Sequence, residues 1–290
     1  VFTTAKDRST ELRDAVRAHA GNGTANGLWA QVTGGKTKLK GISTGAQDLD
    51  LDTDAYGLAV GGEAALQNIT LGAAFMGGSG KTENDSVAGK DDFNYYGISF
   101  YAKTQVQGID LEGDVSAAWL KSDLTVGGAA DVDTDTTTAV YSLGIQAKKT
   151  FNLGVDVTPF IGMDVYHIKS DGFTTNHGVS IEDANATIVE FPIGAEVKKA
   201  LQTSSGFSVA PSFSLAVVPT VGCKDIDSKV RFAGAESTYN FTFADDVKVR
   251  SQLGIEAQKD NFTLGLAAGY DWGNEERSAA SVQLRAKYAF

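Results

Sequence analysis

The chain has 290 residues, of which 33 are glycine, about 11% against a usual ~7%. Its 25 Lys and Arg residues against 36 Asp and Glu give a formal charge of −11, which argues against nucleic-acid binding, because phosphate contacts need a basic surface. The single cysteine, Cys223, excludes an intrachain disulfide framework, a multi-cysteine zinc site and an iron–sulfur cluster. No run of 18 apolar residues occurs, so no transmembrane helix is predicted, while a membrane β-barrel remains possible.

The first predicted element is a charged helix over residues 5–20, which contains no Gly or Pro and stops at Gly21-Asn22-Gly23. Apart from alanines, its apolar residues are only Leu12 and Val16. So narrow an apolar stripe does not dock on an ordinary core, so the helix should be solvated or surrounded by polar groups. The alternative is a disordered leader that is helical only by propensity. The charged residues of this candidate pore helix are Lys6, Arg8, Glu11, Arg13, Asp14 and Arg17.

From Gly27 onward the hydrophobicity alternates with period two, which predicts β-strands throughout. The last strand shows it best, with Val282, Leu284, Tyr288 and Phe290 on one face. We predict twelve strands, near 28–40, 55–66, 69–80, 93–106, 110–122, 139–150, 155–169, 187–200, 206–220, 247–256, 262–272 and 280–290.

The connections alternate between tight turns and long polar loops. Turns such as Gln67-Asn68 follow even-numbered strands, and long segments such as 41–54, 170–186 and 221–245 follow odd-numbered ones. Outer-membrane barrels have this asymmetry, with short periplasmic turns and long extracellular loops. A soluble β-sandwich or a β-solenoid also alternates. Strands of about 11–14 residues and aromatic residues near strand ends, Trp272 and Tyr288 among them, favour the membrane barrel.

The polar face of each strand then lines a lumen. Small residues share it, and twelve strands should enclose a space about as wide as one helix. On our register the lumen carries ten acids and five bases, namely Glu63, Asp110, Glu112, Asp114, Asp156, Asp164, Glu190, Glu196, Glu256 and Asp271 with Lys198, Lys248, Arg250, Arg285 and Lys287. The helix, at +1 from four bases and three acids, complements this acidic lumen. All four prolines fall in the seventh to ninth predicted strands, where bulges or displaced strand ends are expected.

A short charged helix, a Gly-Leu-Trp-Ala-Gln-Val-Thr-Gly-Gly first strand at 27–35, twelve strands and a terminal Tyr288-Ala289-Phe290 together resemble the translocator β-domain of monomeric (type Va) autotransporters. The resemblance implies a 12-stranded antiparallel transmembrane β-barrel at 27–290, with residues 1–26 as a pore-spanning helix and linker. It implies a translocator and anchor in the bacterial outer membrane that is not an enzyme, needs no cofactor and works as a monomer. It further implies a passenger domain before Val1, plugging by the helix after translocation, and a C-terminal signal for the barrel-assembly machinery at Val282, Leu284, Tyr288 and Phe290.

Two other functions stay open, a porin and a barrel enzyme of the phospholipase or protease type. The enzyme would need a nucleophile beside His167 or His177, and no serine is singled out. Family members that cut their own passenger use an Asn-Asn pair in the pore helix, which is absent between residues 1 and 27. Aspartate runs at 48–54 and 131–135 lack the Gly and Glu of an EF-hand loop, so we predict solvated loops and no metal site.

Overall fold

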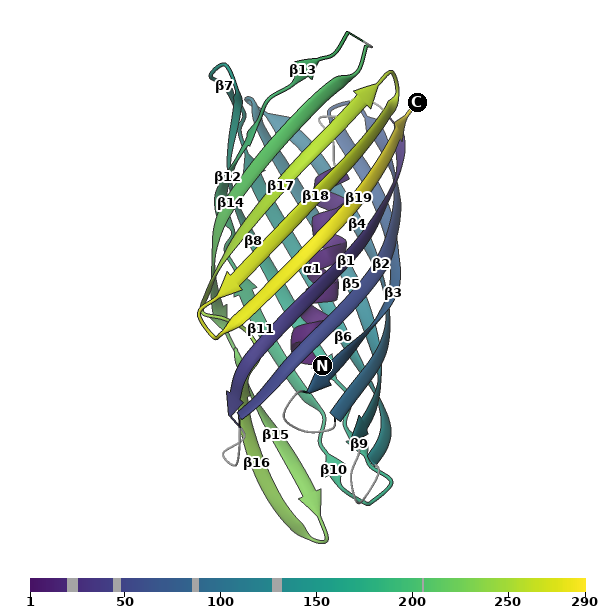
Figure 1. Ribbon diagram of the computed structural model, residues 1–290, viewed down its shortest axis with the longest axis vertical. Coiled ribbons are helices and arrows are strands. Elements are labelled where there is room, and N and C mark those ends of the chain that lie inside the picture. Colours follow the sequence, from purple (N-terminus) through teal and green to yellow (C-terminus); the bar gives the residue numbers. More distant parts are fainter. Residues whose placement is uncertain (20–25, 44–47, 85–88, 127–131, 205) are drawn as a thin grey trace.

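The structure is a computed structural model that describes residues 1–19, 26–43, 48–84, 89–126, 132–204 and 206–290. One helix, α1 (Phe2–His19), lies inside a closed antiparallel barrel (Figure 1). The barrel strands are β1 (Gly27–Ser43), β2 (Asp48–Leu66), β3 (Ile69–Asn84), β4 (Gly89–Val106), β5 (Ile109–Val126), β6 (Val132–Lys148), β8 (Asp156–Ser170), β11 (Ala184–Glu190), β12 (Ile193–Lys198), β14 (Ser208–Gly222), β17 (Val247–Lys259), β18 (Phe262–Gly273) and β19 (Arg277–Ala289).

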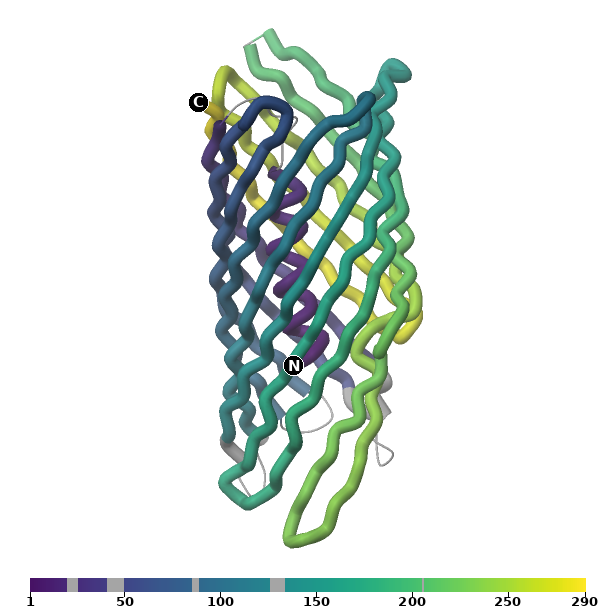
Figure 2. The backbone as a smooth tube through the Cα atoms, turned by 180° about the vertical axis from the view of Figure 1, so that it is seen from behind, coloured from purple at the N-terminus to yellow at the C-terminus, as the bar shows by residue number. Residues whose placement is uncertain are grey.

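The barrel closes where the first and last strands meet, with Gly27 opposite Ala289 and Leu39 opposite Arg277. β11 and β12 follow one another along the same neighbours, β8 and β14, and count as one interrupted strand, so the wall has twelve strands as predicted. Figure 2 shows the helix within the lumen from the opposite side. Among the described residues, no helix is both long and apolar enough to cross a membrane.

Side chains alternate strictly between the two faces of the wall. Outward positions are apolar and exposed, as at Leu253 (64%) and Leu284 (56%), whereas inward positions such as Asp114 and Glu190 are polar and buried. This arrangement inverts that of a soluble sandwich and fits a wall between lipid and a polar lumen. A soluble fold is therefore excluded by burial as well as by pattern.

The two ends of the barrel differ. We call one the short-turn end, where two-residue connections such as Gln107-Gly108 join strands; both residues have positive φ, 52° and 75°, as tight hairpin turns require. Small extensions, β7 (Phe151–Asn152) and β13 (Leu201–Gln202), lengthen the wall there (Figure 1). The other end is the long-loop end, toward which the N-terminus of α1 lies.

The long segments 170–186 and 221–245, predicted as loops, contain a second sheet. Its strands are β9 (Phe173–Thr174), β10 (Ser180–Ile181), β15 (Asp225–Phe232) and β16 (Ala235–Thr242). The β15–β16 hairpin projects beyond the barrel at the long-loop end (Figure 2). Loop prediction was wrong here because the segments are rich in Ser, Thr, Asp and Gly.

The helix begins at Phe2, three residues earlier than predicted. Its first turn is held by tertiary contacts, because the Phe2 ring packs against Phe241 and Phe243 at centroid distances of 6.4 and 5.7 Å. The Thr3 hydroxyl also donates to the Phe243 carbonyl at 3.0 Å. Contacts so distant in sequence cannot be read from local propensity.

Of the two outcomes expected at the prolines, the structure shows displaced strand ends and no bulges: the wall is interrupted at Pro192 without a shift in its register. Glu190 pairs with Asp164 and Ile193 with Ile161, the same register on both sides of Pro192. The carbonyl oxygens of Pro159, Pro211 and Pro219 accept from backbone N–H groups of Lys149, Lys199 and Phe191, which lie just past a strand end or in the β11–β12 gap. The missing proline N–H groups thus fall where a ladder already ends or breaks.

Candidate functional site

The candidate site is the lumen together with α1. Lys6, Arg13 and Arg17 have the i, i+7, i+11 spacing that places side chains on one face of a helix. Lys6 lies 2.6 Å from Glu190 of β11, and Arg13 lies 3.1 Å from Asp114 of β5. We call these three bases the basic stripe of α1.

Asp164 of β8 completes the partner set of the basic stripe. It lies 2.6 Å from Arg17 and 3.5 Å from Arg13. The Arg13 side chain is fully buried and its guanidinium also lies 4.7 Å from the centroid of the Tyr166 ring. Buried charges of this kind need several partners, and here two arginines share two aspartates.

Asp7, Glu11 and Asp14 form a second stripe, which we call the acidic stripe. Asp7 accepts a hydrogen bond from Arg277 of β19, and Asp14 lies 3.4 Å from Arg250 of β17. Glu11 pairs within the helix with Arg8 at 2.6 Å. The bases and acids of α1 thus point mainly to different strands of the barrel.

Apolar packing supports the charged contacts on the β4–β6 side of the lumen, where α1 lies closest to the wall. Leu12 is fully buried, and a Cβ on Gly97 of β4 would come within 3.0 Å of it. A Cβ on Gly144 of β6 would come within 2.8 Å of the Arg13 guanidinium. These two glycines let the helix approach the wall.

The C-terminal end of α1 is clasped near the barrel seam. The His19 ring stacks on Trp29 of β1 at 4.4 Å, and Lys287 of β19 donates to the His19 carbonyl at 2.9 Å. Lys287 also donates to Glu63, and Trp29 donates to the Tyr101 hydroxyl at 3.0 Å. Helix end, first strand and last strand are therefore held by one cluster.

The lumen has two walls of opposite charge. The acidic wall, on β4, β5, β6, β8 and β11, carries Asp91, Asp110, Glu112, Asp114, Asp164 and Glu190 with the bases Lys103 and Lys148. The basic wall, on β17, β18 and β19, carries Lys248, Arg250, Arg277, Arg285 and Lys287 with the acids Glu256 and Asp271. The basic stripe of α1 meets the acidic wall, and Asp7 and Asp14 of the acidic stripe meet the basic wall.

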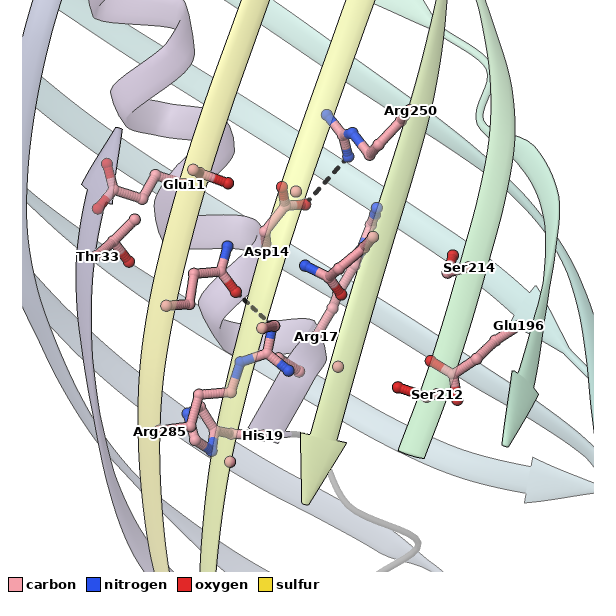
Figure 3. A pocket seen from close by; sticks show the side chains of 18 of the residues that line it. Glu11, Asp14, Arg17, His19, Thr33, Glu196, Ser212, Ser214, Arg250 and Arg285 are labelled. Carbon is pink, nitrogen blue, oxygen red and sulfur yellow. Dashed lines mark hydrogen bonds and ion pairs between the residues drawn. The ribbon is translucent and has the colours of Figure 1, made fainter. Parts of the chain in front are cut away.

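A cavity of about 820 Å³ separates α1 from part of the basic wall. Figure 3 shows Glu11, Asp14 and Arg17 on the helix side, with Arg250, Arg285 and Ser212 on strands across from it. Its lining residues include charged groups of both signs, so the cavity suits water and ions rather than an apolar ligand. Among the described residues no group of three metal-ligating side chains is found.

Other lumen residues named from sequence also face inward. Glu112 lies 2.5 Å from Lys148 and 3.4 Å from Lys103, and Glu256 accepts a hydrogen bond from Lys198. Arg285 donates to Gln283. The bases Lys103, Lys148 and Arg277 were missed. Alternation along β4 and β6 could have found the two lysines, whereas Arg277 lies in a segment assigned to a loop.

The C-terminal residues lie on the outer face. Val282, Leu284, Tyr288 and Phe290 are each at least 50% exposed and share the outward register of β19. All four side chains are therefore accessible from outside the barrel.

The candidate enzyme residues, His167 and His177, are both exposed. His167 is exposed and bonded to the Thr187 hydroxyl at 2.9 Å, in the outward register of β8. Cys223 is exposed, and its thiol lies 3.5 Å from the Asp225 carbonyl. The aspartate run at 48–54, predicted as a solvated loop, lies instead at the start of β2, where Asp52 pairs with Lys36 at 2.9 Å. The run at 131–135 lies partly outside the described residues.

Comparisons with known proteins agree with this architecture. The family model for the autotransporter beta-domain matches residues 28–271. No curated protein sequence matches the chain. The translocator domain of autotransporter NalP from Neisseria meningitidis superposes with a TM-score of 0.75 at 13% identity, covering 99% of this chain and 96% of that one.

Two further solved structures are similar. The transport unit of the autotransporter AIDA-I from Escherichia coli gives a TM-score of 0.68 at 14% identity and covers all of both chains. The beta domain of the Bordetella autotransporter BrkA gives 0.64 at 16% identity, covering 92% of this chain and 100% of that one. The match to the family model spans most of the sequence, and the protein therefore belongs to the autotransporter beta-domain family and is a translocator barrel of the bacterial outer membrane.

Proposed function

We propose that α1 is a plug seated by charge, which closes the translocator lumen once the passenger has crossed. The observation that carries this proposal is the match between two stripes of α1 and two walls of the lumen. Ion pairs at 2.6 Å (Lys6 to Glu190) and 3.4 Å (Asp14 to Arg250) lie on different sides of the helix. Contacts on two sides fix the rotation of the helix about its axis as well as its depth.

The chain direction agrees with export through the lumen. The first turn of α1 packs at the long-loop end against Phe241 and Phe243, and its last turn lies beside Trp29 near the short-turn end. Outer-membrane barrels keep their long loops outside the cell. A passenger joined before Val1 therefore emerges at the cell surface and stays anchored there by the barrel.

The finer parts of the function follow from the same geometry. The outward Val282, Leu284, Tyr288 and Phe290 form the signal for the barrel-assembly machinery. A wall that closes on itself through β1 and β19 leaves no strand edge for a second copy, so the barrel works as a monomer. We assign any enzymatic activity to the passenger, because the lumen acids Asp114, Asp164 and Glu190 are engaged in ion pairs with bases of α1.

The test is conductance of the barrel in a planar bilayer. A chain that begins at Gly27 should conduct severalfold more than the full chain, because twelve strands enclose a space about one helix wide. Equal conductance of the two chains would show that α1 does not plug the lumen.

A disulfide supplies the matched control. The Ser9 and Ser142 hydroxyl oxygens lie 3.2 Å apart, a spacing that fits a crosslink between α1 and β6. In a Cys223→Ser background, Ser9→Cys with Ser142→Cys should form that crosslink in the assembled barrel and keep the conductance low. Failure to crosslink would contradict the seating of the helix.

A further inference from the structure

We propose that three outward lysines at the short-turn end, Lys149, Lys199 and Lys259, bind anionic phospholipid headgroups of the periplasmic leaflet. We call them the basic arc. They lie at the ends of neighbouring parts of the wall, in the order β6, β8, β12, β14 and β17. The inference concerns the outer surface and is independent of the plug.

The register of each strand sends these lysines toward lipid. Lys149 follows the outward Tyr141, Leu143 and Ile145 at even spacing, and all three are about half exposed. Lys259 has the same relation to Leu253 and Ile255 of β17. Each lysine is thus the outward residue next along from the apolar belt.

Lys199 occupies the equivalent place beyond β12. It follows the outward Ile193 and Val197, and its backbone N–H bonds to the Pro211 carbonyl at 3.2 Å, which continues the ladder with β14. All three lysine side chains are exposed.

The basic arc combines free ammonium groups with aromatic rings. Lys149 lies 5.4 Å from the centroid of the Phe151 ring, and Lys259 lies 5.0 Å from that of Phe207. Within the described part of the chain, no carboxylate forms an ion pair with any lysine of the arc. Aromatic rings and the ammonium groups of snorkelling lysines are found together at the level of membrane interfaces.

Elsewhere at the short-turn end, the described outward residues include no such base. From β19 round to β5, the last outward residues at the short-turn end are uncharged, among them Leu28, Leu66, Ile69 and Ile109. Of the outward lysines at the long-loop end, three have acids beside them: Lys36 lies 2.9 Å from Asp52, Lys81 lies 2.8 Å from Glu83, and Lys90 pairs with Asp92.

Charge and depth identify the lipid. Because outer-membrane barrels place their short turns in the periplasm, the basic arc lies at the headgroup level of the periplasmic leaflet. A lysine near an anionic surface gains about 1 kcal/mol, and phosphate oxygens complement an unpaired ammonium group. A phospholipid with a net negative headgroup should therefore be held in preference to a zwitterionic one.

The experiment measures the lipids that stay bound to the barrel. The full chain is reconstituted in vesicles of equal phosphatidylglycerol and phosphatidylethanolamine, extracted gently and examined by native mass spectrometry. We expect phosphatidylglycerol adducts to exceed phosphatidylethanolamine adducts by about fivefold. Lys149→Gln with Lys199→Gln and Lys259→Gln should bring the ratio close to one.

The matched control removes the same number of outward charges at the other end, by Lys36→Gln, Lys81→Gln and Lys90→Gln, and should keep the wild-type ratio. Heat-modifiable gel mobility verifies that all three proteins are folded. No enrichment in the wild type, an unchanged ratio in the arc variant, or an equal loss in the control would overturn the proposal. Adding lipid A tests the other source of phosphate: arc-dependent adducts of lipid A in place of phosphatidylglycerol would also overturn it.

Discussion

At some positions of this barrel, only glycine leaves room for a neighbouring aromatic side chain. A Cβ on Gly61 of β2 would come within 2.4 Å of the Trp29 indole. That ring cannot move aside, because it stacks on His19 and donates a hydrogen bond to Tyr101. The glycines of the lumen therefore make room for wall side chains as well as for the helix, which composition alone does not reveal.

Gly61→Ala should consequently lower the free energy of unfolding by about 1–3 kcal/mol, the usual cost of overpacking. Gly34→Ala is the matched control, since its Cβ would meet nothing within 4 Å. Urea titration followed by heat-modifiable gel mobility measures both. Equal stability of the two variants would mean that Trp29 can be displaced without cost.

Arg13 tests whether the basic stripe holds the helix. Arg13→Met keeps a long side chain beside Tyr166 but leaves Asp114 and Asp164 with Arg17 as their remaining helix partner. Removing one member of a buried ion cluster costs about 3 kcal/mol, which corresponds to roughly a hundredfold rise in the open fraction. Single-channel recording should show that rise, and Arg231→Met on the exposed hairpin should not. Identical open fractions would assign the seating to apolar contacts alone.

At the scale of elements, the helix is joined to the hairpin of β15 and β16. Phe241 and Phe243 hold Phe2, whereas the hairpin tip carries exposed Phe232. An ion pair at the tip, Arg231 to Glu236, lowers the pKa of the glutamate through a hydrogen bond and lies in solvent. We therefore expect substitutions at the base of the hairpin to loosen the first turn of α1, and substitutions at its tip to leave it in place.

Phe241→Ala with Phe243→Ala should free the first turns of α1 by removing the apolar contacts of Phe2. A reporter cysteine at fully buried Ser9, in a Cys223→Ser background, should then react with maleimide at least about tenfold faster, the ratio expected for 1.4 kcal/mol of lost packing. Phe232→Ala is the control and should leave the rate unchanged. Slow labelling in both variants would show that ion pairs hold the helix without the hairpin.

The strands were predictable from sequence because one face meets lipid and the other polar groups, so period two persists along each strand. The hairpin at 225–242 was missed, although Tyr239 and Phe241 alternate along its second strand and Phe243 follows directly after it. Both faces of its tip are exposed to solvent. Neither face therefore has to be apolar, and the sequence there need not alternate between apolar and polar residues. Of the two outcomes expected at the prolines, bulges or displaced strand ends, only the second is found, because a missing N–H at a strand end needs no bulge.

At the scale of the whole molecule, alternation gave the lumen residues but not their partners. That Lys6 meets Glu190, and Arg17 meets Asp164, depends on strand tilt and on the rotation of the helix, neither of which is local in sequence. The separation of charge follows the order of the strands, because the acidic wall is built from β4 to β11 and the basic wall from β17 to β19. The lumen, predicted to carry ten acids and five bases, is polarised across its width.

Polarised walls predict a change in ion selectivity when the helix is removed. With α1 in place, the basic stripe covers Asp114, Asp164 and Glu190, and the open cavity lies against the basic wall. Deleting residues 1–26 uncovers these three acids, so the ratio of cation to anion permeability should rise, by about twofold or more. Reversal potentials in a salt gradient measure the ratio for both chains. In the truncated chain, replacing the three acids by Asn, Asn and Gln should return the ratio toward that of the full chain; if it does not, the acidic wall does not set the selectivity.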